Sequence, residues 1–308
     1  MLFDFSEGYY NSRASKSNVR YEILRNIFCV AASRAKRQII YVADEKEPLL
    51  KQQQLSTPFQ TKKEIEPQQI DEMFSFKYKE SVDACFDLLE YEEIPVDDNS
   101  VIEIIEADHN IDLMPCAGVY QELSYFSSYD YDKALNSFTG SRDKLQTWAV
   151  VEEVRKLPEP KDLIEKVLYL TACATLHMRY VKQVVERFIT EENAEKLHAR
   201  LAEVFARDEQ VQVRCEIKIP KLKAKGLCDV LVDDTIYELK FVHELSHEHF
   251  LQLACYMYAL DKEKGVLWNT RTNERFLVKI PDKEKFIRYV EATVNKQAIP
   301  KDTSKRKI

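Results

Sequence analysis

The hydrophobic pattern of this 308-residue chain changes its period at Val211, and that change constrains the fold more than any other feature. Three short runs rich in β-branched residues follow, VQVRCEIKI, GLCDVLVDD and TIYELKFV, separated by PKLKAK and by a tight turn at residues 233–234. Such runs between turn residues are typical of strands. Next come a helical pattern with Ser246 as its N-cap, a hairpin formed by VLWNT and RFLVKI, and a closing helix over residues 282–295. This order predicts an α/β fold.

The region before Val211 is predicted to be mostly helical. A long helix is expected from Lys161 to Ile189, after two prolines, and a second from Glu191 to Ala206. Earlier residues include an amphipathic stretch and the strand-like run VIEIIEA at residues 101–107. Six glutamines and three prolines between Asp44 and Gln69 indicate an exposed linker. We therefore expect an N-terminal segment, a linker, an α/β connecting region, a main domain and a basic tail, at residues 1–45, 46–70, 71–155, 156–300 and 301–308.

The composition excludes several classes of protein. Hydrophobic residues make up 45% of the chain and charged residues 31%, which favours a folded core over disorder. No apolar run approaches the ~20 residues of a membrane span, and the N-terminus lacks the layout of a secretion signal. The seven scattered cysteines favour a reducing, intracellular location. With only 5 glycines and no phosphate-binding loop motif, the chain alone is not expected to be an ATPase or a dinucleotide enzyme.

Three positions in the strand-rich region indicate a site of chemistry. Asp229 lies on the second predicted strand, and Glu238 and Lys240 lie on the third. Because successive side chains of a strand point to opposite faces, Glu238 and Lys240 share one face while Leu239 points into the core. The hairpin places Asp229 about 5 Å from Glu238, on the neighbouring strand. Two such carboxylates repel each other unless a cation lies between them, and oxygen ligands suit Mg²⁺ or Mn²⁺.

An ammonium group beside these carboxylates can orient or deprotonate a water molecule. The pattern therefore predicts metal-assisted attack of water on a phosphodiester. The simpler alternative is a surface hairpin that carries a Glu–Lys pair, since this pattern also recurs by chance.

Two further features complete a known arrangement. Gln252 and Tyr256 are four residues apart and share one face of the next helix, and His177 lies on the long helix upstream. In this order, the residues resemble those of the RecB-type branch of the PD-(D/E)XK nucleases. The resemblance covers about the last half of the chain. It implies a restriction-endonuclease-like αβββαβ core with helical additions, and a separate resemblance implies a small N-terminal helicase-derived segment.

The resemblance also implies roles for individual residues. The implied metal ligands are His177, Asp229, Glu238 and the backbone carbonyl of Leu239. Lys240 would place the nucleophile, and Gln252 and Tyr256 would support the site or contact the DNA backbone. Two departures from the family stand out, because the Asp229-to-Glu238 spacing of nine residues is short and Cys173 replaces the small residue expected four positions before the histidine. His198 on the following helix is a competing ligand candidate.

A zinc-peptidase pattern lies in the same stretch. His243, Glu244 and His247 match H-E-x-x-H, in which two histidines one helical turn apart bind Zn²⁺ and the glutamate acts as a base. That reading needs one continuous helix from His243. Because Ser246 is predicted to be the N-cap of the helix, the two histidines should not share one.

Basic residues near the predicted site favour a groove for phosphates, although a solvated surface would have the same composition. Because the net charge is −7, nucleic-acid binding would depend on such a local basic face. The predicted DNA-binding residues are Lys221, Lys223, Lys225, Arg179 and Lys182, with Arg214, Lys218 and Arg187 nearby. We expect no iron–sulfur cluster, since no cysteine follows Cys255, and we expect Cys173, Cys228 and Cys255 to be core residues.

The N-terminal stretch NIFCVAASRAKRQIIYV resembles the last motif of UvrD-like superfamily 1 helicases. The resemblance covers about the first 45 residues. It implies that Arg34 would contact the γ-phosphate of ATP, but only if a helicase partner, as a subunit or domain, supplied the Walker motifs.

Taken together, the patterns predict a metal-dependent DNA nuclease that acts on ends or single strands, forms the C-terminal part of a helicase–nuclease and does not associate with a membrane. A DNA-binding or helicase-docking module that has lost catalysis is the second reading. A zinc metallopeptidase is the third.

Overall fold

The computed structural model describes residues 67–75, 77–105, 111–138, 144–182 and 187–297. The chain divides into two units after Glu64, and every described residue belongs to the second unit. The helicase-like segment with Arg34, nearly all of the predicted linker and the basic tail lie outside the described residues.

The described chain is built around a mixed seven-stranded sheet in which β1, β4, β5, β6, β7 and β2 are adjacent in that order and β3 pairs with β4. Their bounds are β1 Gln68–Gln69, β2 Glu90–Ile94, β3 Gln210–Ile219, β4 Leu222–Val232, β5 Thr235–Lys240, β6 Lys264–Asn269 and β7 Glu274–Lys279. β5 and β6 are parallel and joined through α11 (His247–Ala259), and β1 is parallel to β4. The other pairs are antiparallel. This mixed α/β architecture is consistent with the expected restriction-endonuclease-like fold.

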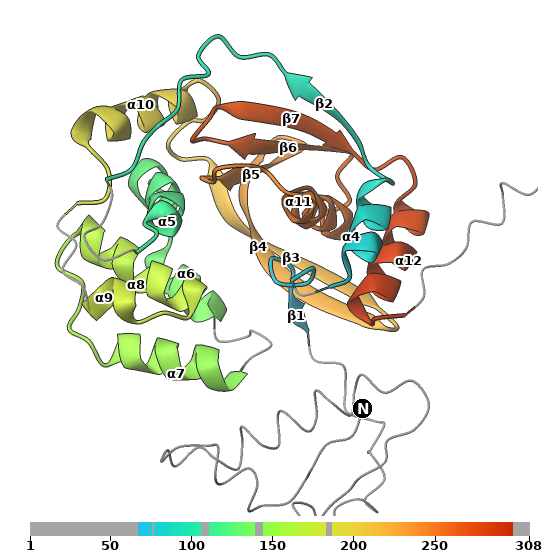
Figure 1. Ribbon diagram of the computed structural model, residues 1–308, viewed down its shortest axis with the longest axis horizontal. Coiled ribbons are helices and arrows are strands. Elements are labelled where there is room, and N and C mark those ends of the chain that lie inside the picture. The colour runs from blue at the N-terminus through green and yellow to red at the C-terminus, as the bar shows by residue number, and fades with distance from the viewer. Residues whose placement is uncertain (1–66, 76, 106–110, 139–143, 183–186, 298–308) are drawn as a thin grey trace, which may run out of the picture. The chain divides into compact units, whose positions relative to one another are not determined.

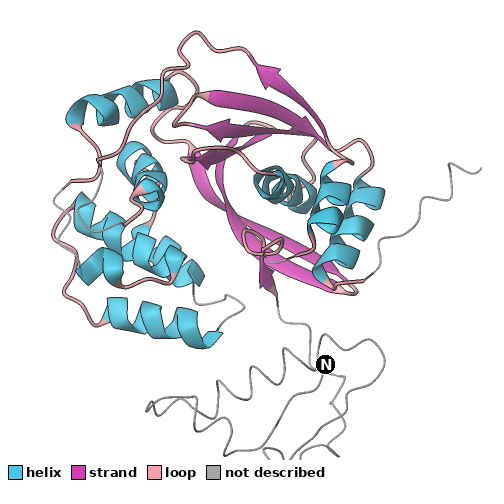
Figure 2. Cartoon of the chain, in the orientation of Figure 1, coloured by secondary structure: helices cyan, strands magenta, loops and turns pink. Residues whose placement is uncertain are grey.

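Helices cover both sides of the sheet (Figures 1 and 2). The helices other than α11 are α4 Lys79–Phe86, α5 Met114–Tyr125, α6 Tyr131–Ser137, α7 Lys144–Arg155, α8 Leu163–Thr175, α9 Arg179–Lys182, α10 Glu191–Ala202 and α12 Lys283–Val294. α11, α4 and α12 share one core with the sheet, around Leu251, Phe286 and Ile236. The ends of α5 and α10 pack on other sheet residues, including Trp268 and Val230, and the remaining helices form a core of their own.

The sheet divides at Asp229. β4 and β5 pair from the hairpin turn only as far as Val230 and Tyr237. Beyond this point β4 stays with β3, and β5 stays with β6. The short strand β1 pairs with β4 at Ala224 and Lys225, on the edge that β5 has left. The result is a fork between two arms of the sheet, with Asp229 on one arm and Glu238 on the other.

The strands and helices expected after Val211 are confirmed. Each predicted strand corresponds to one of β3 to β7 within a few residues, and the two last helices are α11 and α12. Ser246 is the N-cap of α11, as expected. The helix expected from residue 191 is also present as α10. Period-2 and period-3.6 patterns were reliable here because each element buries one face against a neighbour.

The prediction of one long helix over residues 161–189 is wrong. α8 ends at Thr175, where Leu176 adopts a left-handed conformation with φ 57° and its N–H bonds to the Ala172 carbonyl. The turn returns the chain to the helical core, where Tyr180 is buried and donates through its hydroxyl to the Asp112 carbonyl. This tertiary packing outweighs the continuous helical pattern.

The strand predicted at residues 101–107 is also not formed over the described residues 101–105. Ile102 is fully buried there, and its N–H donates to the Arg271 carbonyl, while the N–H of Ile105 donates to the Phe188 carbonyl. The alternating isoleucines therefore reflect an extended segment on the helical core, with isolated hydrogen bonds instead of a ladder.

The expected boundary between residues 155 and 156 stays a prediction. β2 and α4, which precede it, join the sheet edge and the core beneath α11. None of the helices in the described ranges is both long and apolar enough to cross a membrane.

Candidate active site

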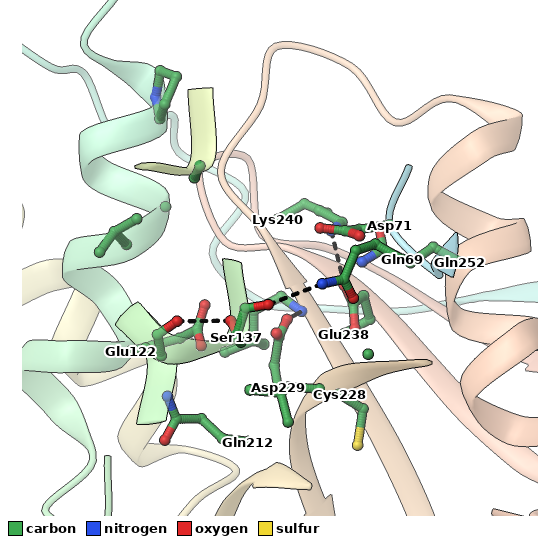
Figure 3. Close-up of a pocket in the computed structure, with 18 of the residues that line it drawn as sticks. Gln69, Asp71, Glu122, Ser137, Gln212, Cys228, Asp229, Glu238, Lys240 and Gln252 are labelled. Atoms are coloured by element: carbon green, nitrogen blue, oxygen red, sulfur yellow. Dashed lines mark hydrogen bonds and ion pairs between the residues drawn. The ribbon is translucent and has the colours of Figure 1, made fainter. Parts of the chain in front are cut away.

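A cavity of about 1000 Å³ lies between the fork in the sheet and helices α5, α6 and α8. Among its lining residues are five that the sequence singled out: Asp229, Glu238, Lys240, Gln252 and Tyr256. Figure 3 shows the side chains of Asp229 and Glu238 entering the same space from neighbouring strands. The structure thus brings the predicted carboxylates, the lysine and the Gln–Tyr pair together.

Asp229 occupies the point where the two strands part. Its carboxylate oxygen Oδ2 accepts the N–H of Leu239 at 2.7 Å. This side chain satisfies a β5 amide that has no carbonyl partner on β4. The bond holds the two arms of the fork together and aims Asp229 at Glu238.

Glu238 is the most deeply buried carboxylate of the cavity, with 1% of its surface exposed. Its Oε1 atom accepts from Lys240 Nζ at 2.8 Å, and Lys240 Nζ also donates to Gln252 Oε1 at 2.9 Å. Gln252 Nε2 in turn donates to the Tyr256 hydroxyl at 3.4 Å. The helix residues therefore fix the ammonium group, and through it one oxygen of Glu238.

Tyr256 reaches the fork because residue 226 is a glycine. A Cβ atom at Gly226 would lie 2.9 Å from the tyrosine ring and 3.3 Å from Ile70. The ring therefore packs directly on the β4 backbone, beneath the cavity.

Glu122 is a site residue that the sequence analysis missed. It lies on α5, lines the cavity and faces the fork from the helical side (Figure 3). A signal was present, because Gly118 precedes Glu122 by four residues, which is the small-residue spacing that was absent before His177. A search for that spacing with glutamate in place of histidine would have found it.

The three carboxylates crowd one another electrostatically. Burial and the charge of Asp229 raise the pKa of Glu238 to about 8, although Lys240 opposes the shift. Burial and the charge of Glu238 raise the pKa of Glu122 to about 8. Burial and the charge of Glu122 raise the pKa of Asp229 well above its usual range. Burial lowers the pKa of Lys240, but the surrounding carboxylates outweigh it and the net shift is upward.

The donor set fits a hard divalent cation. Glu122, Asp229 and Glu238 offer oxygen ligands, as Mg²⁺ and Mn²⁺ prefer. Glu238 Oε2 is buried and has no hydrogen-bond partner, an arrangement that is costly unless a ligand completes it. Among the described residues, no three His, Cys, Asp or Glu side chains already converge as they would around an ion. The carboxylates would therefore have to close together to bind one.

Neither histidine candidate reaches the cavity lining. His177 is exposed in the turn after α8, not on a helix as predicted, because α8 ends two residues before it, at Thr175. His198 lies on α10, where its Nε2 atom is 2.7 Å from the Ser124 hydroxyl and its ring stacks on Tyr120. Among the residues that line the described cavity, the carboxylate that α5 contributes is Glu122.

The zinc-peptidase pattern is not assembled. α11 begins at His247, so His243 lies outside the helix, as expected. His243 lines the cavity, whereas His247 pairs with Asp83 at 2.7 Å and stacks on Phe86 at 3.7 Å between ring centroids.

Only some of the predicted basic residues lie at the cavity. Lys225 and Arg214 line the cavity. Lys221 lies in the exposed β3–β4 turn, 3.9 Å from Glu291. The other predicted contacts, Lys223 on β4 and Arg179 and Lys182 on α9, are not among the residues that line the cavity.

A buried polar contact joins the two walls of the cavity. The hydroxyl of Thr270 donates to Gln121 Oε1 at 2.5 Å and lies 3.1 Å from the Lys240 carbonyl, which also accepts the Thr270 N–H at 2.8 Å. Gln121 precedes Glu122 on α5. The contact therefore sets the helix that carries Glu122 against the strand that carries Lys240.

The segment around β1 contributes another carboxylate to the cavity, in addition to Glu122, Asp229 and Glu238. Asp71 lines the cavity and lies beside Lys240 in Figure 3. Ile70 and Met73 on either side are fully buried, and Gln69 donates to the Ser137 carbonyl of α6 at 2.9 Å. β1 therefore closes the open side of the fork and connects it to the helices.

A family model described as the PD-(D/E)XK nuclease superfamily matches residues 168–279. The matched range contains Asp229, Glu238 and Lys240, whereas Glu122 and Asp71 precede it. No curated protein and no solved structure matches the chain. The superfamily indicates a nuclease, a metal-dependent hydrolase with DNA as its substrate.

Proposed function

We propose that this protein hydrolyses phosphodiester bonds of DNA with Mg²⁺ or Mn²⁺ as cofactor, and that it acts on ends or single strands. The observation that carries the proposal is the fork in the sheet, where Asp229, Glu238 and Lys240 line one cavity with Glu122 opposite. The family match over residues 168–279 supports the reaction class.

The proposed roles are metal binding, orientation of the attacking water and support of the lysine. Glu122, Asp229 and Glu238, with the backbone carbonyl of Leu239, would hold the divalent ion. When bound, the ion supplies positive charge that stabilises the developing negative charge of the phosphate group. Lys240, held by Gln252, donates hydrogen bonds from its ammonium group and orients the attacking water. Tyr256 supports Gln252 from beneath.

Hydrolysis forms one P–O bond to the water oxygen and breaks one P–O bond to the leaving sugar oxygen, which receives a proton. The raised pKa of Lys240 keeps its ammonium group protonated, so it acts as a hydrogen-bond donor in this arrangement.

The test is cleavage of end-labelled linear and circular DNA, single- and double-stranded, with Mg²⁺, Mn²⁺ or EDTA. We expect cleavage with either ion, none with EDTA, and none in Asp229→Asn or Glu122→Gln. Asp282→Asn is the matched control, because Asp282 caps α12 and does not line the cavity. It should retain activity. Cleavage that survives Asp229→Asn would show that the site lies elsewhere.

We further propose that the chain works with a superfamily 1 helicase subunit or domain, as in the RecB-type helicase–nucleases. The support is the VAASRAK string around Arg34, which lies outside the described residues. ATP would then act only through the partner's Walker motifs. Arg34→Ala should leave ATP-independent cleavage unchanged while lowering ATP hydrolysis by a complex with that partner.

A further inference from the structure

At Gly118, neither the backbone conformation nor the packing of the described residues requires a glycine. It lies in the interior of α5, where glycine is disfavoured because it loses more backbone entropy than alanine. No glycine in the described chain has a positive φ, so its backbone does not require one. A Cβ atom built at Gly118 would have no atom within 4 Å.

The other described glycines contrast with Gly118. At Gly226 a Cβ would meet the Tyr256 ring, and at Gly265 it would lie 2.7 Å from Met257. Both are explained by close packing inside the protein. Gly118 instead borders the cavity, one helical turn before Glu122, so the space it leaves open belongs to the cavity.

The lining residues of α5 next to Gly118 are uncharged, and the lining carboxylates Asp112 and Glu122 precede and follow them along the chain. Pro115 and Val119 flank it on the cavity-lining side of α5 and are partly exposed. Among the described lining residues of α5, α6 and α8, only Glu122 and Lys133 carry charge. This surface is therefore suited to an uncharged, flat group, whereas a phosphate would be favoured nearer Lys240.

The floor of the same cavity carries the unpartnered atom that indicates a bound cation. Glu238 is 1% exposed, and its Oε2 atom has no hydrogen-bond partner. Four helical residues span about 6 Å along the axis, so a group bound at Gly118 would lie within one nucleotide of a phosphate bound near Glu122.

We propose that Pro115, Gly118 and Val119 form a nucleoside shelf, against which the sugar and base of the nucleotide next to the cleaved phosphate lie. The proposal rests on the nuclease function and specifies its substrate as an unpaired nucleotide. In a duplex the base is stacked and paired, so its face could not reach the shelf. In a single strand the base is free to turn toward an apolar wall.

The test compares Gly118→Ala and Gly118→Val with the full-length parent on a single-stranded oligonucleotide. Ala174→Val, which adds bulk at another lining position, is the matched control. We expect Gly118→Ala to raise the melting temperature by about 2–4 °C, because alanine favours the helix. The KM should rise about threefold in Gly118→Ala and about tenfold or more in Gly118→Val, as expected when added methyl groups fill a binding pocket. A glycine with a merely structural role would not combine higher stability with weaker binding.

A second comparison uses an oligonucleotide with one abasic sugar next to the cleavage position. The parent should bind and cleave it about tenfold less well, and Gly118→Val should add little further loss on this substrate. Fluorescence anisotropy of the same labelled oligonucleotides in EDTA gives affinities that do not depend on catalysis. If the parent cleaves nothing with any ion, the nuclease proposal fails, and the anisotropy series still decides whether the shelf exists. Parent-like affinity and KM for Gly118→Val, or no effect of removing the base, would overturn the shelf.

Discussion

Among single residues, the proposed chemistry would depend most on the ammonium group of Lys240, which lies between a carboxylate and an amide. Lys240 contacts Glu238 and Gln252, and no other basic side chain has this position in the described site. We expect Lys240→Ala to lower kcat by about 10²–10³-fold, as for other groups that stabilise a transition state. DNA affinity measured by anisotropy should stay nearly unchanged. Lys279→Ala, on the exposed face of β7, is the control, and equal losses in both variants would contradict the role of Lys240.

The crowded carboxylates predict a dependence of stability on pH. Glu238 and Glu122 each have a pKa of about 8 in the folded protein, against ordinary values of 4.5. Between these values the folded state binds more protons than the unfolded state, so the free energy of unfolding falls as pH rises. In EDTA, the melting temperature should drop by about 5 °C or more from pH 5 to pH 8.

Adding Mg²⁺ or Mn²⁺ should restore much of that loss at pH 8, since a cation relieves the repulsion between carboxylates. Glu238→Gln should flatten the pH dependence in EDTA. A melting temperature that rises over the same interval would contradict the crowding of these groups.

Basic residues are expected to differ in importance according to where the fold places them. Lys225 lines the cavity, whereas Arg179 on α9 is not among its lining residues. We expect Lys225→Glu to weaken DNA binding and to reduce the slope of log affinity against log salt by about 1. Arg179→Glu should leave both nearly unchanged. Equal effects would indicate that DNA follows a wider surface than the cavity.

At the scale of elements, the site depends on how α5 is set against β5. The Thr270 hydroxyl contacts Gln121 on the helix and the Lys240 carbonyl on the strand. Thr270→Val keeps the shape of the side chain but removes both contacts. We expect it to lower kcat by about tenfold with little change in KM, because a shift of about 1 Å in a catalytic group is enough for such a loss.

Thr270→Ser keeps the hydroxyl and should restore most of the activity. Thermal melting separates this effect from general destabilisation, since both variants should remain folded at the assay temperature. Equal activity of the valine and serine variants would show that the contact does not position the site.

For the whole molecule, the folded unit that carries the candidate site extends well beyond residues 168–279, the range that the family model matches. β2 completes the sheet, and Ile70, Met73 and Phe74 are buried in the core beneath α11. A chain that begins at Ile65 should therefore fold cooperatively and retain Mg²⁺-dependent cleavage. A chain that begins at residue 156 lacks Glu122, Asp71 and β2, and we expect no cooperative melting and no cleavage. Activity in the shorter chain would contradict the role of α5.

Sequence patterns alone predicted the succession of strands and helices after Val211 and the grouping of Asp229, Glu238 and Lys240. These features depend on local rules, because strand alternation and a short hairpin relate residues that are close in the chain. The same local reasoning failed for His177, because the end of α8 at Leu176 depends on where Tyr180 becomes buried. It also predicted a strand at residues 101–107, whereas the described residues 101–105 form no ladder.

Which residues face these three across the cavity depends on tertiary packing. Glu122 lies more than one hundred residues before Glu238, and Asp71 lies on a strand of two residues that no periodicity reveals. Their positions beside the fork depend on packing between α5, β1 and the sheet. Local sequence patterns do not predict packing between elements that are far apart in the chain. The position of a carboxylate in a helix can be read from the sequence, but whether it meets another carboxylate is decided by how the helix packs.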